Sequence, residues 1–203
     1  MRIILLFLAL MLSASRCGDA QDSDARLTAG KPEAIFTIEP VFPEREHNEL
    51  VMLMFTASGP GEPLRLQIID VTFTAGSEAG ALDALSAWYT GVVPGVPVKV
   101  LFAASENPSL HVKLSGDLAI AEGKHTFILD FSADPGTDPG AHLKIESVSF
   151  IFTDGSSADY ITGKDEGVIR FGRVVRAAGQ DGADTYRIPG IVTTNSGALV
   201  AVY

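Results

Sequence analysis

Short apolar segments separated by Gly- and Pro-rich turns recur about every ten residues through most of the chain. Within 64–75, LRLQIIDVTFTA, apolar and polar side chains alternate, as on a strand with one buried face. Comparable segments lie at 34–42, 50–59, 98–104, 110–116, 124–133 and 143–154. Short strands joined by tight turns bury their apolar faces by packing two sheets together. The pattern therefore predicts an all-β fold, with an antiparallel, jelly-roll-like β-sandwich over 34–154.

Two stretches depart from simple alternation. Between Ile68 and Ile69 the apolar phase shifts by one residue, which predicts a β-bulge. In 77–91, SEAGALDALSAWYTG, helical spacing and alternation are both present. We interpret this stretch as a short helix or turn that leads into a strand around residues 87–89.

The N-terminus carries a secretory signal pattern. Arg2 precedes an unbroken apolar run over 3–12, and small residues follow. This run is too short to span a bilayer, and small residues at 18 and 20 fit cleavage after Ala20. We expect a signal peptide at 1–20, a polar linker at 21–33, and export to the periplasm, the cell surface or the medium.

The single cysteine, Cys17, allows two interpretations. It lies just after the apolar run, where bacterial lipoproteins carry the cysteine that anchors them to lipid. Arg16 precedes it, however, where such signals need a small residue. Cys17 is therefore either a lipid anchor or is discarded with the signal, which would leave a mature protein without a disulfide.

Charge and motif content exclude several classes of function. A net charge of −10 repels phosphate backbones, so no nucleic-acid partner is expected. The four histidines are not at ligand spacing, so neither a metal nor another cofactor is predicted, and His111 and His125 are expected on polar strand faces. The loop DPGTDPG at 134–140 could hold calcium, but Asp before Pro-Gly more commonly forms turns.

Trp88 and Tyr89 are adjacent, so on a strand one ring faces the core and the other faces solvent. An exposed aromatic ring could stack on a sugar, which makes both residues candidate sugar-stacking positions. The alternative is that the tryptophan lies in the sandwich core, where large aromatic residues are commonly buried.

A polar, glycine-bearing stretch at 155–167 is predicted to be a linker to a second unit at 168–203. In that unit, Arg187 is flanked by Tyr186 and by the sequence Ile-Pro-Gly. An arginine held in this way is pre-organised to bind a carboxylate with two parallel hydrogen bonds. Spacing alone also allows a surface arginine beside a β-turn.

The stretch 170–203 resembles the opening of the catalytic domain of bacterial exo-sialidases. The resemblance rests on Tyr-Arg-Ile-Pro at 186–189, Gln-Asp-Gly at 180–182 and Thr-Thr-Asn-x-Gly-x-Leu-x-Ala at 193–201. Residues 34–154 are similar, more loosely, to the β-sandwich that precedes the propeller in some sialidases. That likeness rests on VTFTAG at 71–76, Tyr89 with its following glycine, and a Leu-Gly-Phe pattern over 118–127.

The resemblance implies a six-bladed β-propeller that removes terminal sialic acid from glycoconjugates with retention. Such enzymes use a tyrosine nucleophile assisted by a glutamate, an aspartic acid as acid/base, and three arginines that bind the sugar carboxylate. Only Arg187 carries over, as the first of those arginines. The catalytic residues would lie beyond Tyr203, so 168–203 would be the incomplete start of the propeller, and the 203 residues alone are expected to be inactive.

A second hypothesis is that the chain is a non-catalytic carbohydrate-binding β-sandwich module, which would bind glycans through Trp88 or Tyr89. The reading frame after Tyr203 separates the two hypotheses. The sialidase hypothesis requires an aspartate soon after Tyr203, repeated Asp boxes, two more arginines and a late tyrosine.

Overall fold

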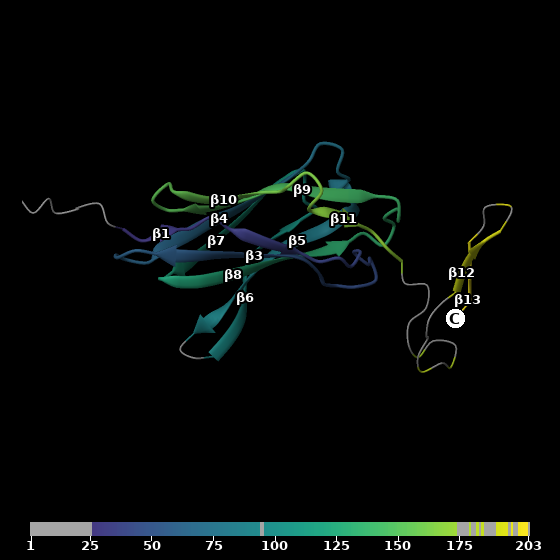
Figure 1. The fold of residues 1–203 in the computed structure, drawn as a ribbon, viewed down its shortest axis with the longest axis horizontal. Coiled ribbons are helices and arrows are strands. Elements are labelled where there is room, and N and C mark those ends of the chain that lie inside the picture. The colour runs from purple at the N-terminus through teal and green to yellow at the C-terminus, as the bar shows by residue number, and fades with distance from the viewer. Residues whose placement is uncertain are drawn as a thin grey trace, which may run out of the picture.

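The structure, a computed structural model, describes residues 26–93, 96–173, 179, 182, 184, 190–194, 196 and 199–202. Two antiparallel sheets, here called sheet I and sheet II, pack face to face (Figure 1). This arrangement confirms the predicted all-β fold and the antiparallel sandwich. None of the described residues forms a helix long and apolar enough to cross a membrane.

Sheet I has six strands in the order β1-β3-β8-β5-β6, with β2 also paired to β3. Their bounds are β1 Thr28–Ala29, β2 Glu33–Phe36, β3 Asn48–Ser58, β5 Leu82–Val93, β6 Val96–Glu106 and β8 Gly123–Ala133. A 3-10 helix over Ala79–Ala81 precedes β5. Because β3, β8 and β5 are neighbours, segments far apart in the sequence meet at the centre of this sheet.

Sheet II has five strands in the order β10-β9-β4-β7, with β11 also paired to β9. Their bounds are β4 Leu64–Phe73, β7 His111–Ile120, β9 His142–Phe152, β10 Ser157–Ile161 and β11 Val168–Arg170. In the C-terminal part of the chain, β12 (Gly190–Thr193) and β13 (Leu199–Val202) pair with each other as an antiparallel hairpin.

The core lies between the sheets and is dominated by aromatic rings. Phe127 of β8 and Phe150 of β9 are fully buried, and their ring centroids lie 5.1 Å apart. Phe55 of β3 adds a third ring, 5.0 Å from Phe150. These rings come from both sheets. In β4 and β9 buried positions alternate with more exposed ones, as the apolar pattern predicted, whereas in β8 residues 127–131 are all buried.

The predicted bulge in β4 is confirmed, one residue earlier than expected. Its register against β9 shifts between Leu66 and Ile68, which makes Gln67 the extra residue there. Against β7 the register also shifts at this point, but the extra residue lies on β7. The shift allows Leu66 and Ile69 both to face the core, where each is completely buried.

The stretch 77–91 also behaves as predicted, with a helical turn followed by a strand, but the strand begins earlier, at Leu82. The helical spacing of Leu82 and Leu85 has a different origin. The register against β8 shifts between Leu82 and Ala84, so both leucines are buried on one face. A β-bulge therefore accounts for a spacing that would suggest a helix.

The sandwich extends beyond the predicted limits of 34–154. Strand β1 lies in the predicted linker 21–33, and β10 lies in the predicted linker 155–167. Strand β11, predicted to belong to the propeller, pairs with β9 instead. These segments are short or at sheet edges, so few of their side chains are buried and their sequences look like linkers. The signal segment and Cys17 lie outside the described residues.

The aromatic core predicts a large effect for Phe127→Ala. Replacing a fully buried phenylalanine by alanine typically costs about 3–5 kcal/mol, through lost transfer energy and the cavity left behind. We expect a loss of that size in urea denaturation. Ile161→Ala is the control, because this side chain is 75% exposed and should change stability by less than about 0.5 kcal/mol. A similar loss for both variants would contradict this account of the core.

Candidate functional site

Trp88 and Tyr89 face opposite sides of sheet I, as predicted for adjacent strand residues. Trp88 is paired in register with Ile128 on the outer face, whereas Tyr89 is paired with the buried Phe127. Both side chains are partly exposed, but Tyr89 packs against the core. Of the two predicted sugar-stacking positions, only Trp88 presents its ring on an outer surface.

Tyr89 instead packs against the core. Its ring centroid lies 5.2 Å from that of Phe127, and its hydroxyl lies 3.2 Å from Nδ1 of His125. His125 Nε2 lies 2.8 Å from the Ala121 carbonyl oxygen, which can only accept, so Nε2 donates and Nδ1 of the neutral ring accepts from Tyr89. Burial raises the pKa of the Tyr89 hydroxyl. A Cβ on Gly91 would lie 2.4 Å from this hydroxyl, which explains the glycine that follows the tyrosine.

A row of apolar side chains crosses the outer face of sheet I, one from each of five strands. It runs in direct register through Ile35, Met52, Ile128, Trp88 and Leu101. Three of them are well exposed, at 59% for Ile35, 37% for Met52 and 47% for Leu101. A hollow of about 240 Å³ lies beside the first three. We call this row, with its polar border, the Trp88 face.

Charged side chains form the border of the Trp88 face on one side. Lys99 Nζ lies 5.3 Å from the centroid of the Trp88 ring, within cation–π range, and 2.7 Å from Oε1 of Glu49. His47 approaches the same ring edge-on, with centroids 6.3 Å apart. The border thus carries both hydrogen-bond donors and acceptors next to an aromatic surface.

His47 is held by a buried carboxylate. Its Nδ1 lies 2.9 Å from Oδ2 of Asp130, and the backbone N–H of Asn48 donates to Oδ1 at 2.8 Å. The Asp130 side chain is only 2% exposed. Burial raises the pKa of this carboxyl, whereas His47, the Asn48 amide and Lys99 act to lower it. Asp130 is too enclosed to meet a substrate, so its role is to position His47.

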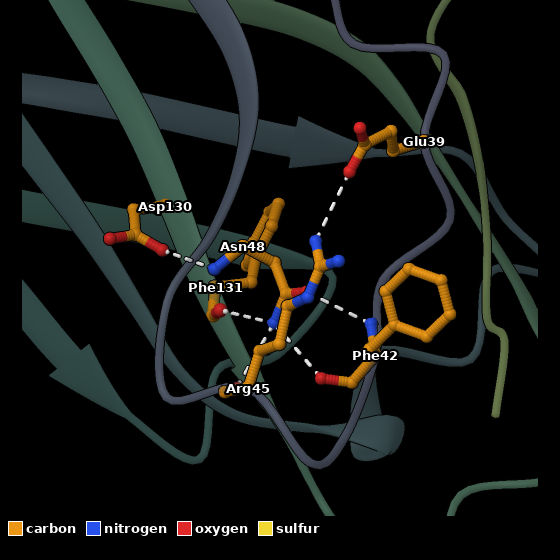
Figure 2. Close-up of polar contacts among 6 residues, drawn as sticks. All are labelled: Glu39, Phe42, Arg45, Asn48, Asp130 and Phe131. Atoms are coloured by element: carbon orange, nitrogen blue, oxygen red, sulfur yellow. Dashed lines mark hydrogen bonds and ion pairs between the residues drawn. The ribbon is translucent and has the colours of Figure 1, made fainter. Parts of the chain in front are cut away.

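Asn48 anchors the loop that carries His47 (Figure 2). Its side-chain nitrogen, Nδ2, lies 3.2 Å from three backbone carbonyl oxygens, those of Phe42, Arg45 and Phe131. Its side-chain oxygen, Oδ1, accepts from the Phe42 N–H at 2.9 Å. Arg45 lies over the Phe42 ring and pairs with Glu39 at 3.1 Å. The loop therefore has a defined shape, and a polar hollow of about 310 Å³ lies beside it.

Arg187, the predicted carboxylate-binding residue, lies outside the described residues, as do all of 185–189. The structure therefore gives no geometry for the motif that carries the sialidase resemblance. In the described part of the chain, no group of three or more His, Cys, Asp or Glu side chains could hold a metal ion.

Two other predictions have clear outcomes. In the 134–140 loop, Asp134 Oδ1 accepts from the N–H of Gly136, and Asp138 Oδ1 accepts from that of Gly140. Both aspartates are therefore turn formers, as favoured. The prediction that His125 lies on a polar strand face is wrong, because this side chain is 6% exposed and is accommodated in the core by the two hydrogen bonds described above.

The sequence did not identify the polar border of the Trp88 face. Its members come from four places: the loop before β3, β3 itself, β6 and β8. Only strand register brings them together, since Glu49 pairs with Asp130 and Trp88 pairs with Leu101. No local motif signals this cluster.

Comparison with known proteins connects the chain to sialidases over part of its length. It is 37% identical over 98 residues to a sialidase of Bacteroides fragilis (strain YCH46), a match that covers 48% of this chain but 18% of that protein. The Hadza microbial sialidase Hz136 matches in structure with a TM-score of 0.60 and 21% identity, over 87% of this chain and 37% of that one. No protein-family model matches the chain.

The match to Hz136 supports the fold alone, because the sequence identity is only 21%. A further structural match, to the CupB6 tip adhesin of Pseudomonas aeruginosa, has a TM-score of only 0.27. The chain thus spans a minor part of each sialidase that it resembles, and what the comparisons show is an all-β chain that is similar to a sialidase over part of its length.

Asp130 predicts a specific pH dependence of stability. Its raised pKa means that the native carboxyl binds a proton at higher pH than the unfolded one, so its contribution to stability grows as pH falls through the folded pKa. Asp130→Asn removes this titration but keeps an oxygen that can accept from Asn48. We expect the stability of the wild type relative to Asp130→Asn to rise as pH is lowered from about 7 to about 4, in urea denaturation at each pH. A difference that stays constant or falls would contradict the prediction.

Proposed function

We propose that this chain is the N-terminal part of an exo-α-sialidase, which hydrolyses terminal sialic acid from glycoconjugates with retention. The observation that carries the proposal is the Tyr-Arg-Ile-Pro motif at 186–189, in a chain that is 37% identical over 98 residues to a sialidase. In this proposal the sandwich is an accessory domain, and the propeller begins after it.

Arg187 is proposed to bind the carboxylate of the sialic acid. The sugar is anionic, while the chain has a net charge of −10 and would repel it weakly, so the site needs a local cation. A planar guanidinium suits a carboxylate because both groups can make two parallel hydrogen bonds. The nucleophile and the acid/base residue would come from the propeller, and the sandwich would supply no catalytic residue.

Arg187→Ala tests this proposal in the protein expressed with whatever follows Tyr203 in its reading frame. A hydrogen bond to a charged group contributes about 1.5–3 kcal/mol, so kcat/KM for a fluorogenic sialoside should fall by about 10- to 150-fold. Arg170→Ala, on the exposed side of β11, is the matched control and should retain activity. Wild-type protein without sialidase activity would refute the proposed enzyme; an active Arg187→Ala variant would refute only the assigned role.

A second candidate function is glycan binding by the sandwich itself. The observation that favours it is the Trp88 face, where a partly exposed indole lies among outward apolar side chains beside donors and acceptors. Sugars present apolar C–H faces and hydroxyl edges, so such a surface suits them. The two basic side chains at the ring, His47 and Lys99, each pair with a carboxylate, so the border offers hydrogen bonds without a strong positive field.

Trp88→Ala tests the second candidate in the 203-residue chain. Titration calorimetry with sialyllactose and with lactose should show binding of at least one sugar by the wild type. Loss of an aromatic anchor should weaken it about tenfold or more. Trp88→Phe keeps an aromatic ring and should retain most of the affinity. Failure of the wild type to bind either sugar, or equal affinity of wild type and Trp88→Ala, would count against the Trp88 face.

A further inference from the structure

The segment 167–173, here called the clasp, joins the two sheets along one side of the sandwich. Its strand β11 pairs with β9 of sheet II. Its next residue, Phe171, forms a parallel bridge with Val41, which lies in the loop between β2 and β3 of sheet I. Two hydrogen bonds fix this bridge: the Val41 N–H donates to the Arg170 carbonyl, and the Gly172 N–H donates to the Val41 carbonyl, both at 2.8 Å.

The clasp is part of the core and leaves little room at its ends. Phe171 is 5% exposed and Val41 is completely buried. Gly167 has a φ of +70°, and a Cβ on it would lie 2.7 Å from Thr162. A Cβ on Gly172 would lie 2.9 Å from the Phe42 ring. The chain can follow this path because both positions lack a side chain.

Arg173 makes the last described contacts of the clasp before residue 179. Its guanidinium donates to the Thr137 carbonyl at 3.0 Å, in the turn after β8, and lies 3.8 Å from Oε1 of Glu44. Glu44 belongs to the same loop as Val41. The clasp therefore holds the β2–β3 loop at two points, one apolar at Val41 and one charged at Glu44.

The other end of this loop reaches the Trp88 face. Asn48 ties the loop to β8, and His47 lies against the Trp88 ring while paired with Asp130. Residues 41–48 are thus the structural link between the segment that leaves the sandwich and the aromatic ring on its outer face.

We propose that the clasp positions the β2–β3 loop, and that His47 is held against Trp88 only while the clasp is docked. Phe171 and Arg173 are then positioning residues for the Trp88 face, although they lie on the far side of the loop from it. The polar border of that face is complete only when the segment leading toward 174–203 leaves the sandwich along this path. The ligand of the face rests on the second candidate function, but the link itself does not.

Trp88 is the only tryptophan of the chain, so its fluorescence reports on the face without any ligand. In the 203-residue chain, Phe171→Ala should shift Trp88 emission to longer wavelength and increase its quenching by acrylamide, because His47 no longer covers the ring edge. Arg173→Ala should shift both in the same direction by a smaller amount. Arg173 is outside the core, so Arg173→Ala tests whether the clasp positions His47 even if Phe171→Ala fails to fold.

Two further variants calibrate the fluorescence. Val168→Ala, also in the clasp but 46% exposed, should match the wild type. His47→Ala removes the contact directly and sets the full size of the change. Circular dichroism and thermal unfolding establish that each variant retains the sandwich.

Hydrogen exchange supplies a second reading of the same link. The Asn48 amide donates to Asp130 at the far end of the loop, so it should exchange about tenfold or more faster in Phe171→Ala and measurably faster in Arg173→Ala. If emission, quenching and Asn48 exchange all match the wild type in whichever of the two variants folds, the Asn48 anchor holds His47 by itself and the proposal is overturned. None of these readouts uses a glycan or sialidase activity, so their outcome is independent of both proposed functions.

Discussion

The packing of Phe127 against Phe150 is the contact on which the remaining structure depends. It joins a central strand of each sheet, with the ring centroids 5.1 Å apart, and so defines the inner face of both. Once Phe127 faces inward, its neighbour Ile128 must face outward, and the register of β8 carries that choice to Met52 on β3 and Trp88 on β5. The apolar row on the outer surface therefore follows from the same alternation that builds the core. A slip of one residue would exchange the two faces.

Much of the fold could be predicted because alternation of apolar side chains is a local property of strands. The bulge in β4 was visible as a change of phase between Ile68 and Ile69, close to the extra residue Gln67, since an inserted residue moves every later side chain to the other face. The extent of the sandwich was not visible. Strand β10 buries Ala158, but most of its other side chains face outward at a sheet edge, so its sequence resembles a linker. Edge strands lack the two-sided burial that gives central strands their pattern.

The candidate site, like the fold, could be predicted where local alternation decides and not where long-range strand pairing decides. The sequence predicts that one of Trp88 and Tyr89 faces solvent, because neighbours on a strand point in opposite directions. It cannot say which, since that depends on Tyr89 meeting Phe127 across β8. Nor can it bring His47 to Asp130, because the two are joined only through long-range register. The tyrosine and glycine at 89 and 91, part of the loose resemblance to sialidase sandwiches, have a packing explanation, since the Tyr89 hydroxyl occupies the space beside Gly91.

The geometry also limits what the sandwich could contribute to hydrolysis. Its most enclosed carboxylate, Asp130, is already bound by His47 and the Asn48 amide, so it has no free position from which to protonate a leaving group. The Tyr89 hydroxyl is directed at His125 in the interior, and burial raises its pKa, so it is a poor nucleophile. The described sandwich instead provides the Trp88 face, which could bind a glycan, and the clasp, which fixes the path of the chain as it leaves the sandwich. In a sialidase built in this way, substrate capture and bond cleavage would belong to different parts of the chain, and the clasp is where the first part ends.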